Sequence, residues 1–214
     1  MQIGDKITFG KHEWRVLDIQ DNRALIITEE VIGKRLYHDT PVDGITWAEC
    51  DMRKYLNGEF YDRFTDEEKA RIVTVINENP DNPWFGTKGG EDTEDNVFNL
   101  TIFDVTCKYF GDSSNLLYNR GKNQTYWFQR KDPNNYRRIA YFNGEMCKWH
   151  LRTPGRYQNR IACIGADANP KKMHLNGSAH ITGNGVYQPL KRQNEMNGDS
   201  DFMGIRPALW LRLG

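Results

Sequence analysis

The chain has 214 residues, of which 38% are hydrophobic, and its mean hydropathy of −0.78 is polar for a folded protein. Six Trp, ten Tyr and ten Phe nevertheless supply large apolar side chains, which argues against a disordered chain and favours one large domain or two small ones. The formal net charge is zero, but residues 120–214 hold 16 Lys and Arg against 6 Asp and Glu, whereas residues 1–119 hold 13 against 23. This asymmetry fits either an anionic partner of the second half or two halves that complement each other.

The sequence indicates a protein without a membrane span. No apolar run approaches the ~20 residues that a transmembrane helix needs, and residues 1–10 lack the apolar stretch of a signal peptide. We therefore expect a cytoplasmic protein. The four cysteines show no C-x-x-C spacing, and buried thiols are the ordinary case for such residues, although disulfides stay open as an alternative. They are Cys50, Cys107, Cys147 and Cys163.

The first predicted elements are strands. Ile7–Phe9 and Trp14–Ile19 have strand-like patterns, and Ala24–Thr28 follows after a turn at Asp21-Asn22. This arrangement predicts an N-terminal hairpin or meander. Val31–Tyr37 is a candidate for a further extended piece.

Three hydroxyl residues, each followed three positions later by a carboxylate, predict helix starts. The pairs are Thr46 with Glu49, Thr65 with Glu68 and Thr101 with Asp104. The first two match the capping box, and the third is its weaker Asp form. We expect the first helix to end at Asn57-Gly58, the second to run to about Val75, and the third to end at Gly111.

A long polar segment, Asn77–Asp95, separates the second and third of these helices. It is rich in Asn, Pro, Gly and acidic residues, with Trp84 and Phe85 as its apolar anchors. A connection of this length needs a reason, which is either function or packing under Trp84. Val97–Leu100 then predicts a buried strand that leads into the third helix.

The second half is predicted to consist mainly of strands and loops. Tyr126–Phe128 is a short aromatic strand, and Asn143-Gly144 is a strong hairpin signal. The chain ends in two apolar alternations, Trp149–Gly155 and Gly204–Leu213, each of which carries an arginine and a proline. We expect these two strands to pair, to close one core and to display the polar segment between them.

Together the elements predict one α+β domain over residues 1–214. Its first part, residues 1–148, contains N-terminal strands, short helices and loops. Its second part, residues 149–214, contains closing strands of a mainly antiparallel sheet with long displayed loops.

Residues that could carry chemistry do not form a recognised pattern. His174 and His180 have no Cys or acidic pair nearby to complete a zinc set, and Glu91–Asp95 lacks the spacing of a calcium loop. There is no G-x-S-x-G motif, and no cysteine lies where a cation or a helix start would activate it. The sequence therefore predicts no catalytic residue, no metal and no cofactor, and solvated loops account for these residues.

The polar segment between the two terminal alternations combines cationic, aromatic and amide side chains. Tyr and Arg supply contact area at modest entropic cost, and Asn supplies adaptable hydrogen bonds. We expect non-catalytic binding of a protein or of an anionic or carbohydrate ligand, with a set of solvated loops as the competing interpretation. Nucleic acid is disfavoured because the aromatic residues are not interleaved as a base-stacking platform requires. The candidate ligand-binding residues are Arg156, Tyr157, Asn159, Arg160, Asn169, Lys171, His174, Asn176, His180, Tyr187 and Arg192.

Several blocks of the chain, taken in order, resemble a known family. They are Gly4–Gly10, Glu13–Leu17, Arg53–Asn57, Asn82–Gly90, Tyr109–Asp112, Leu151–Gly155 and Arg206–Leu211. The family is an uncharacterised bacterial domain, abundant in gut Firmicutes, whose closing pattern is W-L-R-S-P-G … G-V-R-P-A-L-W-L. Thr153 stands here in place of the usual Ser, and Ile205 in place of Val.

That family is similar to the C-type-lectin-like fold, which formylglycine-generating enzymes and the variable proteins of diversity-generating retroelements share. The resemblance implies that residues 156–194 form the ligand face. It also implies a rigid frame of Trp149, Leu151, Arg206, Leu209 and Leu211. The sugar-binding calcium tripeptides E-P-N and Q-P-D are missing here, and so are the paired C-terminal cysteines of the formylglycine-generating oxidases.

Two alternatives to a binding module stay open on this resemblance. One is a retroelement-diversified receptor protein. The other is an enzyme of unknown chemistry related to formylglycine-generating enzymes, which a deep pocket converging on Arg152, Arg206 or His150 would favour. Buried arginines that bond to backbone carbonyls are the structural interpretation of the same residues.

Overall fold

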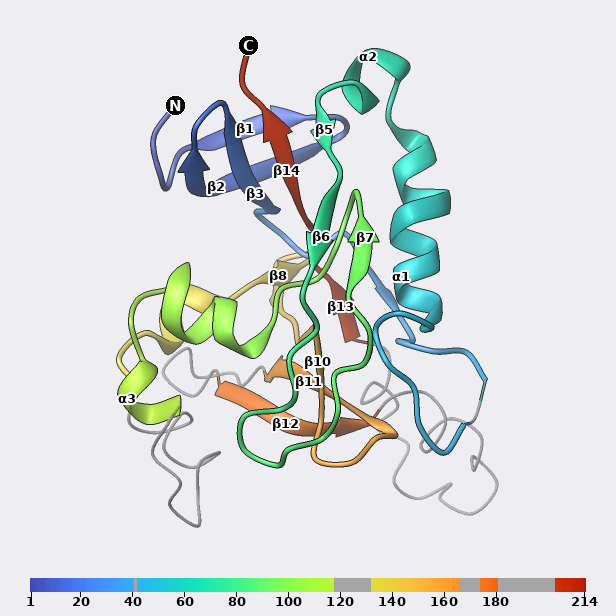
Figure 1. Ribbon diagram of the computed structural model, residues 1–214. Coiled ribbons are helices and arrows are strands. Elements are labelled where there is room, and N and C mark those ends of the chain that lie inside the picture. The colour runs from blue at the N-terminus through green and yellow to red at the C-terminus, as the bar shows by residue number, and fades with distance from the viewer. Residues whose placement is uncertain (41, 118–131, 166–173, 181–202) are drawn as a thin grey trace.

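The structure is a computed structural model that describes residues 1–40, 42–117, 132–165, 174–180 and 203–214 (Figure 1). It is α+β and mainly β, with short helices, two five-stranded sheets and two small hairpins in the described ranges. Both large sheets combine strands from before and after residue 148. The predicted strand Tyr126–Phe128 lies outside the described residues.

The first sheet is antiparallel throughout and holds both ends of the chain. Its strand order is β1-β2-β3-β14-β5. The strands are β1 (Lys6–Phe9), β2 (His12–Gln20), β3 (Arg23–Thr28), β14 (Ala208–Arg212) and β5 (Ile72–Val73). The N-terminal meander predicted from the sequence is confirmed. The last strand lies beside β3, with Trp210 opposite Leu25, so the two chain ends lie close together (Figure 1).

The second sheet has the order β12-β11-β10-β13-β4. Its strands are β12 (His174–His180), β11 (Arg160–Gly165), β10 (Trp149–Pro154), β13 (Met203–Ile205) and β4 (Gly33–Arg35). β10 and β13 are parallel, and the other pairs are antiparallel. The strand β4 confirms the extended piece expected near Val31. Every residue of β10 is buried, so both faces of this strand are covered.

The prediction that the two terminal alternations pair along their length is wrong. They meet at Trp149 and Gly204, but the Leu209–Leu211 part belongs to the first sheet. The change of sheet occurs at Arg206-Pro207, because proline has no N–H to continue a ladder. The Pro207 carbonyl instead accepts a hydrogen bond from Thr28 N at 3.0 Å.

The helices are short and lie mostly in the first half. They comprise α1 (Asp51–Tyr55), the π-helix η1 (Leu56–Phe60), the 3₁₀ turn η2 (Tyr61–Arg63), α2 (Asp66–Lys69), the π-helix η3 (Asp104–Lys108), α3 (Ser114–Leu117) and the 3₁₀ turn η4 (Asn135–Arg138). The segments α1 to η2 form one continuous helical stretch beside the strands β6 (Val75–Asn77) and β7 (Thr93–Asp95) (Figure 1).

Two of the three predicted helix starts are confirmed. Thr65 and Glu68 exchange side-chain to backbone hydrogen bonds of 2.8 and 3.2 Å, and Thr101 and Asp104 exchange bonds of 2.8 and 3.0 Å. The second helix is shorter than predicted, because Ile72–Val73 leaves it to pair with β14.

The prediction for the first helix is wrong at both ends. Its N-cap is Cys50, whose Sγ accepts a hydrogen bond from Arg53 N at 3.4 Å, and not Thr46. The helix does not end at Asn57-Gly58. Asn57 bonds across to Val97 O at 2.9 Å and accepts from Asn96 N at 2.7 Å, so its side chain braces the helix instead of terminating it.

Two hairpins complete the described fold. β6 (Val75–Asn77) pairs with β7 (Thr93–Asp95), and β8 (Tyr141–Phe142) pairs with β9 (Glu145–Met146). The second turn is Asn143-Gly144, with φ of 52° and 81°, as a type I′ turn requires, so this prediction is confirmed. Residues 97–100 are buried as predicted, and they join both large sheets through the bridge from Phe98 to Ala208 and the hydrogen bond from Arg152 N to Leu100 O at 2.9 Å.

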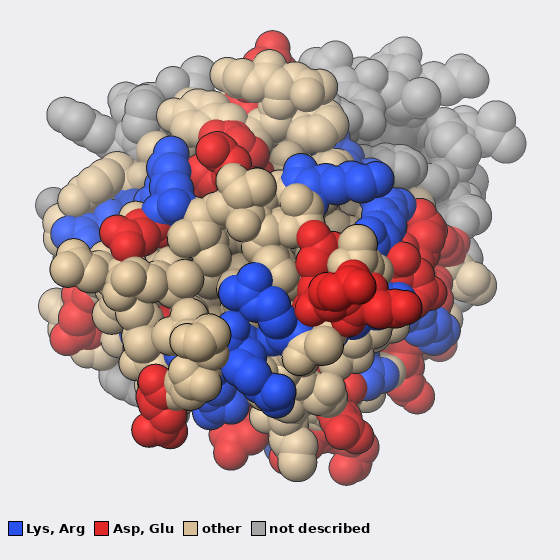
Figure 2. Space-filling model, turned by 90° about the horizontal axis from the view of Figure 1, so that it is seen from above, with Lys and Arg blue, Asp and Glu red and all other residues tan. Residues whose placement is uncertain are grey.

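The core lies between these elements and is built around large side chains. Trp14, Trp47 and Trp149 are fully buried, together with Tyr37 and Phe60. Among the described residues, no helix is both long and apolar enough to cross a membrane. On the face that carries the chain ends, basic and acidic side chains are both present, and acidic ones gather on one side (Figure 2). This face therefore does not display a field of a single sign.

Candidate functional site

The predicted ligand-binding residues fall into three groups in the structure. Arg156, Tyr157 and Asn159 lie in the turn between β10 and β11, and Arg160 begins β11. His174, Asn176 and His180 lie on β12, next to β11, where the structure describes the backbone. Asn169, Lys171, Tyr187 and Arg192 lie outside the described residues. The sheet therefore brings the first two groups onto neighbouring strands.

The turn between β10 and β11 is held by the long loop that joins β6 to β7. Asn82 Nδ2 donates to Pro154 O at 2.7 Å, and Thr87 Oγ1 donates to Arg156 O at 2.9 Å. In the other direction, Gln158 Nε2 donates to Lys88 O at 3.1 Å. The two segments are about seventy positions apart in the sequence. The tip of the long loop is therefore bound to the β10–β11 turn by hydrogen bonds in both directions.

The loop is itself fixed by local contacts. Asn82 Oδ1 accepts from the backbone N of Trp84 at 2.9 Å and of Phe85 at 3.2 Å, which forms a tight turn at its tip. Trp84 Nε1 donates to Leu117 O at 3.2 Å. A Cβ at Gly89 would lie 1.9 Å from Asn79 O, so only glycine allows the two arms of the loop to approach this closely.

Three exposed side chains gather where the loop meets the turn. Phe85 is 42% exposed and Tyr157 is 56% exposed. The guanidinium carbon of Arg156 lies 5.7 Å from the Phe85 ring centre and 5.4 Å from the Tyr157 ring centre, so the cation lies within cation–π distance of both rings. We call Phe85, Arg156 and Tyr157 the aromatic–arginine cluster. Phe85 is not among the residues predicted from the sequence, although a phenylalanine in a polar Gly- and Pro-rich loop was the available signal.

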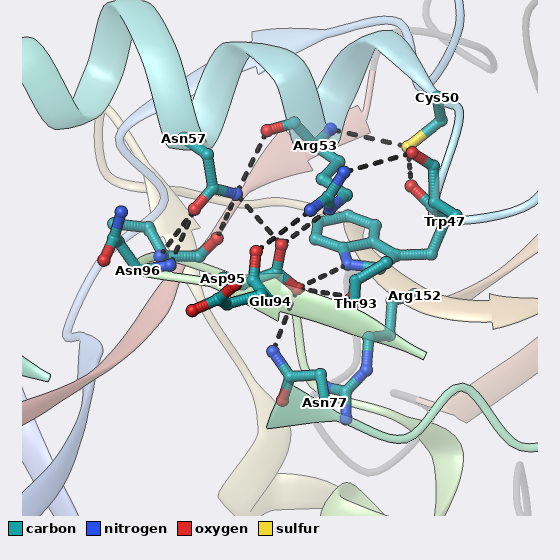
Figure 3. A network of polar contacts seen from close by, with 12 residues as sticks. Trp47, Cys50, Arg53, Asn57, Asn77, Thr93, Glu94, Asp95, Asn96 and Arg152 are labelled. Carbon is teal, nitrogen blue, oxygen red and sulfur yellow. Dashed lines mark hydrogen bonds and ion pairs between the residues drawn. The ribbon is translucent and has the colours of Figure 1, made fainter. Parts of the chain in front are cut away.

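The base of the same loop is a buried polar centre around Asp95 (Figure 3). Its carboxylate is fully buried and pairs with the Arg53 guanidinium at 2.6 Å. Further hydrogen bonds of 2.7 to 3.3 Å come from Trp47 Nε1, Asn57 Nδ2, Asn77 Nδ2 and Thr93 Oγ1. The Asp95 centre therefore joins α1 and η1 to both strands of the β6–β7 hairpin, and it fixes the point from which the loop extends.

The polar residues of the β10 frame are occupied by backbone contacts. His150 Nε2 lies 2.9 Å from Arg35 O, so this nitrogen carries the proton, and burial lowers the pKa of the imidazole to about 4. Arg206 donates from Nε to Thr28 O at 3.0 Å and from Nη2 to Glu29 O at 3.2 Å. Arg206 is therefore a buried arginine that bonds to backbone carbonyls, and His150 is a buried histidine with a backbone partner.

A groove of about 600 Å³ lies beside the β6–β7 hairpin and reaches Arg152. Arg152 donates from Nη1 to Asn99 O at 2.5 Å and from Nη2 to Glu78 O at 3.3 Å, and its guanidinium lies 3.6 Å from Asp104 Oδ2. Its Nε is buried and has no partner among the described residues. Figure 3 shows Arg152 on the Asn77 side of the Asp95 centre.

The expectation that no cysteine lies at a helix start is wrong, because Cys50 is the N-cap of α1, but the buried thiols do not favour a nucleophile. Burial raises the pKa of Cys50 and of Cys163 to about 12, and it also raises the pKa of Cys107. These groups are protonated at neutral pH, and none of the four cysteines, all of which the structure describes, is in a disulfide. In the described ranges, no three His, Cys, Asp or Glu side chains gather as a metal-binding group.

Comparison with known proteins found one family. The model of a family described as a domain of unknown function (DUF6273) matches residues 21–213. The match therefore begins at the turn before β3 and includes the cluster, the Asp95 centre and the groove. Neither a curated protein nor a solved structure matches the chain.

Proposed function

We propose that this chain, which belongs to the DUF6273 family of domains of unknown function, is a non-catalytic binding module. Its ligand face comprises residues 156–194 together with Phe85, and the aromatic–arginine cluster is one described part of that face. The observation that carries the proposal is the exposure of Arg156 and Tyr157 on a turn that a separate loop holds in place, with Phe85 of that loop exposed beside them.

The physical support is preorganisation. Aromatic and arginine side chains are enriched among the residues that dominate binding energy at protein interfaces, because they offer large contact areas, and aromatic side chains also lose few rotamers on binding. Three hydrogen bonds between side chain and backbone fix the turn before any ligand arrives. Part of the ordering cost of association is therefore met in the free protein.

We further propose that the frame is C-type-lectin-like. The presence of the first strand β1 and the last strand β14 in one sheet supports this assignment, because that fold brings its two terminal strands together. The position of the candidate residues on the second sheet and its turn supports it as well.

The partner that fits this face is a protein or an anionic or carbohydrate ligand. Arg156 supplies a cation, and Phe85 and Tyr157 supply apolar surfaces on which a side chain or a sugar ring can pack. An enzyme of unknown chemistry is the second candidate, and the groove that reaches Arg152 is the observation in its favour. A retroelement-diversified receptor is a special case of the binding module, in which the sequence of the face varies between copies.

The test applies the labelled full chain to an array of neutral and anionic oligosaccharides and to a phage-displayed random peptide library. A matched control exists in the chain, because Tyr136 is 59% exposed and Arg137 stacks over its ring at 5.5 Å. We expect a ligand that the Tyr136→Ala/Arg137→Ala variant retains. The Arg156→Ala/Tyr157→Ala variant should bind this ligand with an affinity that is lower by about tenfold or more for each hot-spot residue removed. Absence of any ligand, or equal binding by both variants, would overturn the proposal.

A further inference from the structure

We propose that the groove beside the β6–β7 hairpin is a second binding site, which takes a small carboxylate that carries an apolar group. The carboxylate would lie toward Arg152 and Lys108, and the apolar group would lie against Ile76 and Phe103. This site is separate from the aromatic–arginine cluster, and it is independent of the proposed function of that cluster.

The polar floor of the groove, formed by Asp104, Lys108 and Arg152, has more hydrogen-bond donors than acceptors. Asp104 is already engaged, because its Oδ2 accepts from Thr101 N at 2.8 Å and from Thr101 Oγ1 at 2.7 Å, and its Oδ1 lies 3.4 Å from Lys108 Nζ. Arg152 in turn makes two hydrogen bonds out of the five that a guanidinium can donate. A ligand that enters the floor must therefore accept hydrogen bonds rather than donate them.

The strongest indication of a ligand site is a buried donor of Arg152 that has no acceptor among the described residues. Its side chain is 7% exposed, lines the groove and leaves Nε without a partner among the described residues. A buried donor without an acceptor is costly, and native proteins seldom leave one unpaired. The distance of 3.6 Å to Asp104 is longer than a direct hydrogen bond, so the existing carboxylate does not fully satisfy this cation.

Tyr109 adds a further donor at the groove. Burial raises the pKa of its hydroxyl, and the nearby Asp104 carboxylate acts in the same direction. The hydroxyl therefore keeps its proton at neutral pH and can donate to a ligand oxygen. Lys108 lies over the Phe103 ring at 5.1 Å and the Tyr109 ring at 5.9 Å, so its ammonium group is held near the groove.

The rim of the groove bears two further acids. Asp81 is paired with Lys88 at 2.7 Å and accepts from Gly89 N at 3.1 Å, so its charge is compensated. Glu78 is exposed, and water screens its side chain, while its carbonyl holds Arg152. The floor of the groove therefore holds two positive side chains, Arg152 and Lys108, and one negative side chain, Asp104.

The walls of the groove include apolar side chains, so we expect the ligand to carry an apolar group as well. Ile76 is 77% exposed on β6, and Phe103 is 39% exposed at the start of η3. Leu25 and Trp210 of the first sheet line the groove between them and are buried. Small-molecule sites typically combine mostly apolar walls with a few convergent polar groups, and about 300–1,000 Å³ is their usual volume. The observed groove has a volume in this range, and its lining combines apolar with polar side chains.

The test measures binding of octanoate and phenylacetate to the full chain by NMR titration, with octan-1-ol and phenylacetamide as uncharged analogues. We expect saturable shifts, including that of the Arg152 Nε–H resonance, and about tenfold tighter binding of each carboxylate than of its analogue, as a charge-assisted hydrogen bond provides. Equal affinity of acid and analogue, or no saturable shift for either acid, would overturn the proposal.

Variants at exposed positions keep the test independent of folding. Ile76→Ser and Lys108→Gln should each weaken binding of both acids by about fivefold or more, because the first removes apolar wall and the second removes a cation. Ile3→Ser is the matched control, since Ile3 is 66% exposed and does not line the groove. Arg152→Lys, if it folds, should weaken binding more than either. Unchanged affinity of the Ile76 and Lys108 variants would place the acids elsewhere and contradict the assignment.

Discussion

The two ends of the β6–β7 loop use polar residues in opposite ways. At the base, Asp95 is fully buried and five side chains direct hydrogen bonds to its carboxylate. At the tip, Asn82 and Thr87 bond to backbone of the β10–β11 turn, and Phe85 and Arg156 remain at the surface. The contacts at the base hold the two strands of the hairpin in position. The contacts at the tip hold the β10–β11 turn, and with it Arg156 and Tyr157, in position. The comparison predicts that changes at the base lower stability, whereas changes at the tip lower binding.

The largest effect is expected at the base. Asp95→Asn keeps the shape of the side chain but leaves Arg53 without its carboxylate, and removal of one partner of a buried pair typically costs about 3–5 kcal/mol. The free energy of unfolding in urea measures the loss. A decrease below about 1 kcal/mol would contradict the assignment of Asp95 as the structural centre of the loop.

The next effect is a dependence of stability on pH through His150. Its pKa is about 4 in the folded protein against 6.5 unfolded, so the unfolded state binds more protons between these values. The contribution of His150 is therefore complete above pH 6.5 and is lost as the pH falls toward 4, by about 3 kcal/mol in total.

Urea unfolding at pH 7.5 and pH 5 measures this dependence. Burial also lowers the pKa of His12, so the His12→Gln variant serves as the background in which His150 titrates. In that background stability should still fall between the two pH values. A stability that does not change would show that the imidazole is hydrated rather than enclosed.

A smaller effect is expected halfway along the loop. Gly89→Ala would place a methyl group 1.9 Å from Asn79 O, and forced overpacking of this kind typically costs about 1–3 kcal/mol. Gly58→Ala is the control, because a Cβ there meets nothing within 4 Å. Urea unfolding of both variants should show a loss for Gly89→Ala alone. Equal stability would mean that the two arms of the loop can separate freely.

The smallest effect on stability is expected at the tip. Thr87→Val removes the hydrogen bond to Arg156 O without changing the shape of the side chain, so unfolding should change by about 1 kcal/mol or less. Binding to the ligand identified for the cluster should nevertheless weaken several-fold, because the turn loses a clamp. Thr74→Val, which removes the bond to Asn96 Oδ1 near the base, is the control and should leave binding unchanged. Equal affinities of the two variants would argue against the clamp.

The sequence predicted the elements that local signals determine. The capping pairs at Thr65 and Thr101 and the turn at Asn143-Gly144 depend on residues within four positions of each other. The N-terminal meander likewise follows from alternation between close turns. Such features need no knowledge of the remote chain.

What the sequence could not predict depends on distant partners. The separation of β13 from β14 is decided by the pairing of Trp210 with Leu25, which are 185 positions apart. Phe85 joins Arg156 only because the loop folds onto the turn, and Ile76 and Phe103 meet Arg152 only in the groove. The side chain of Asn57 continues the first helical stretch instead of ending it, because it bonds to Val97 O, 40 positions away. Local spacing of residues in the sequence does not predict these long-range contacts.

The most direct test of the division between base and tip combines two measurements on Arg156→Ala/Tyr157→Ala. Both side chains are exposed, so the account predicts a free energy of unfolding within about 0.5 kcal/mol of the parent chain. It also predicts that affinity for the ligand identified on the array or in the peptide library falls by about a hundredfold. A stable variant that binds this ligand as tightly as the parent would contradict the account.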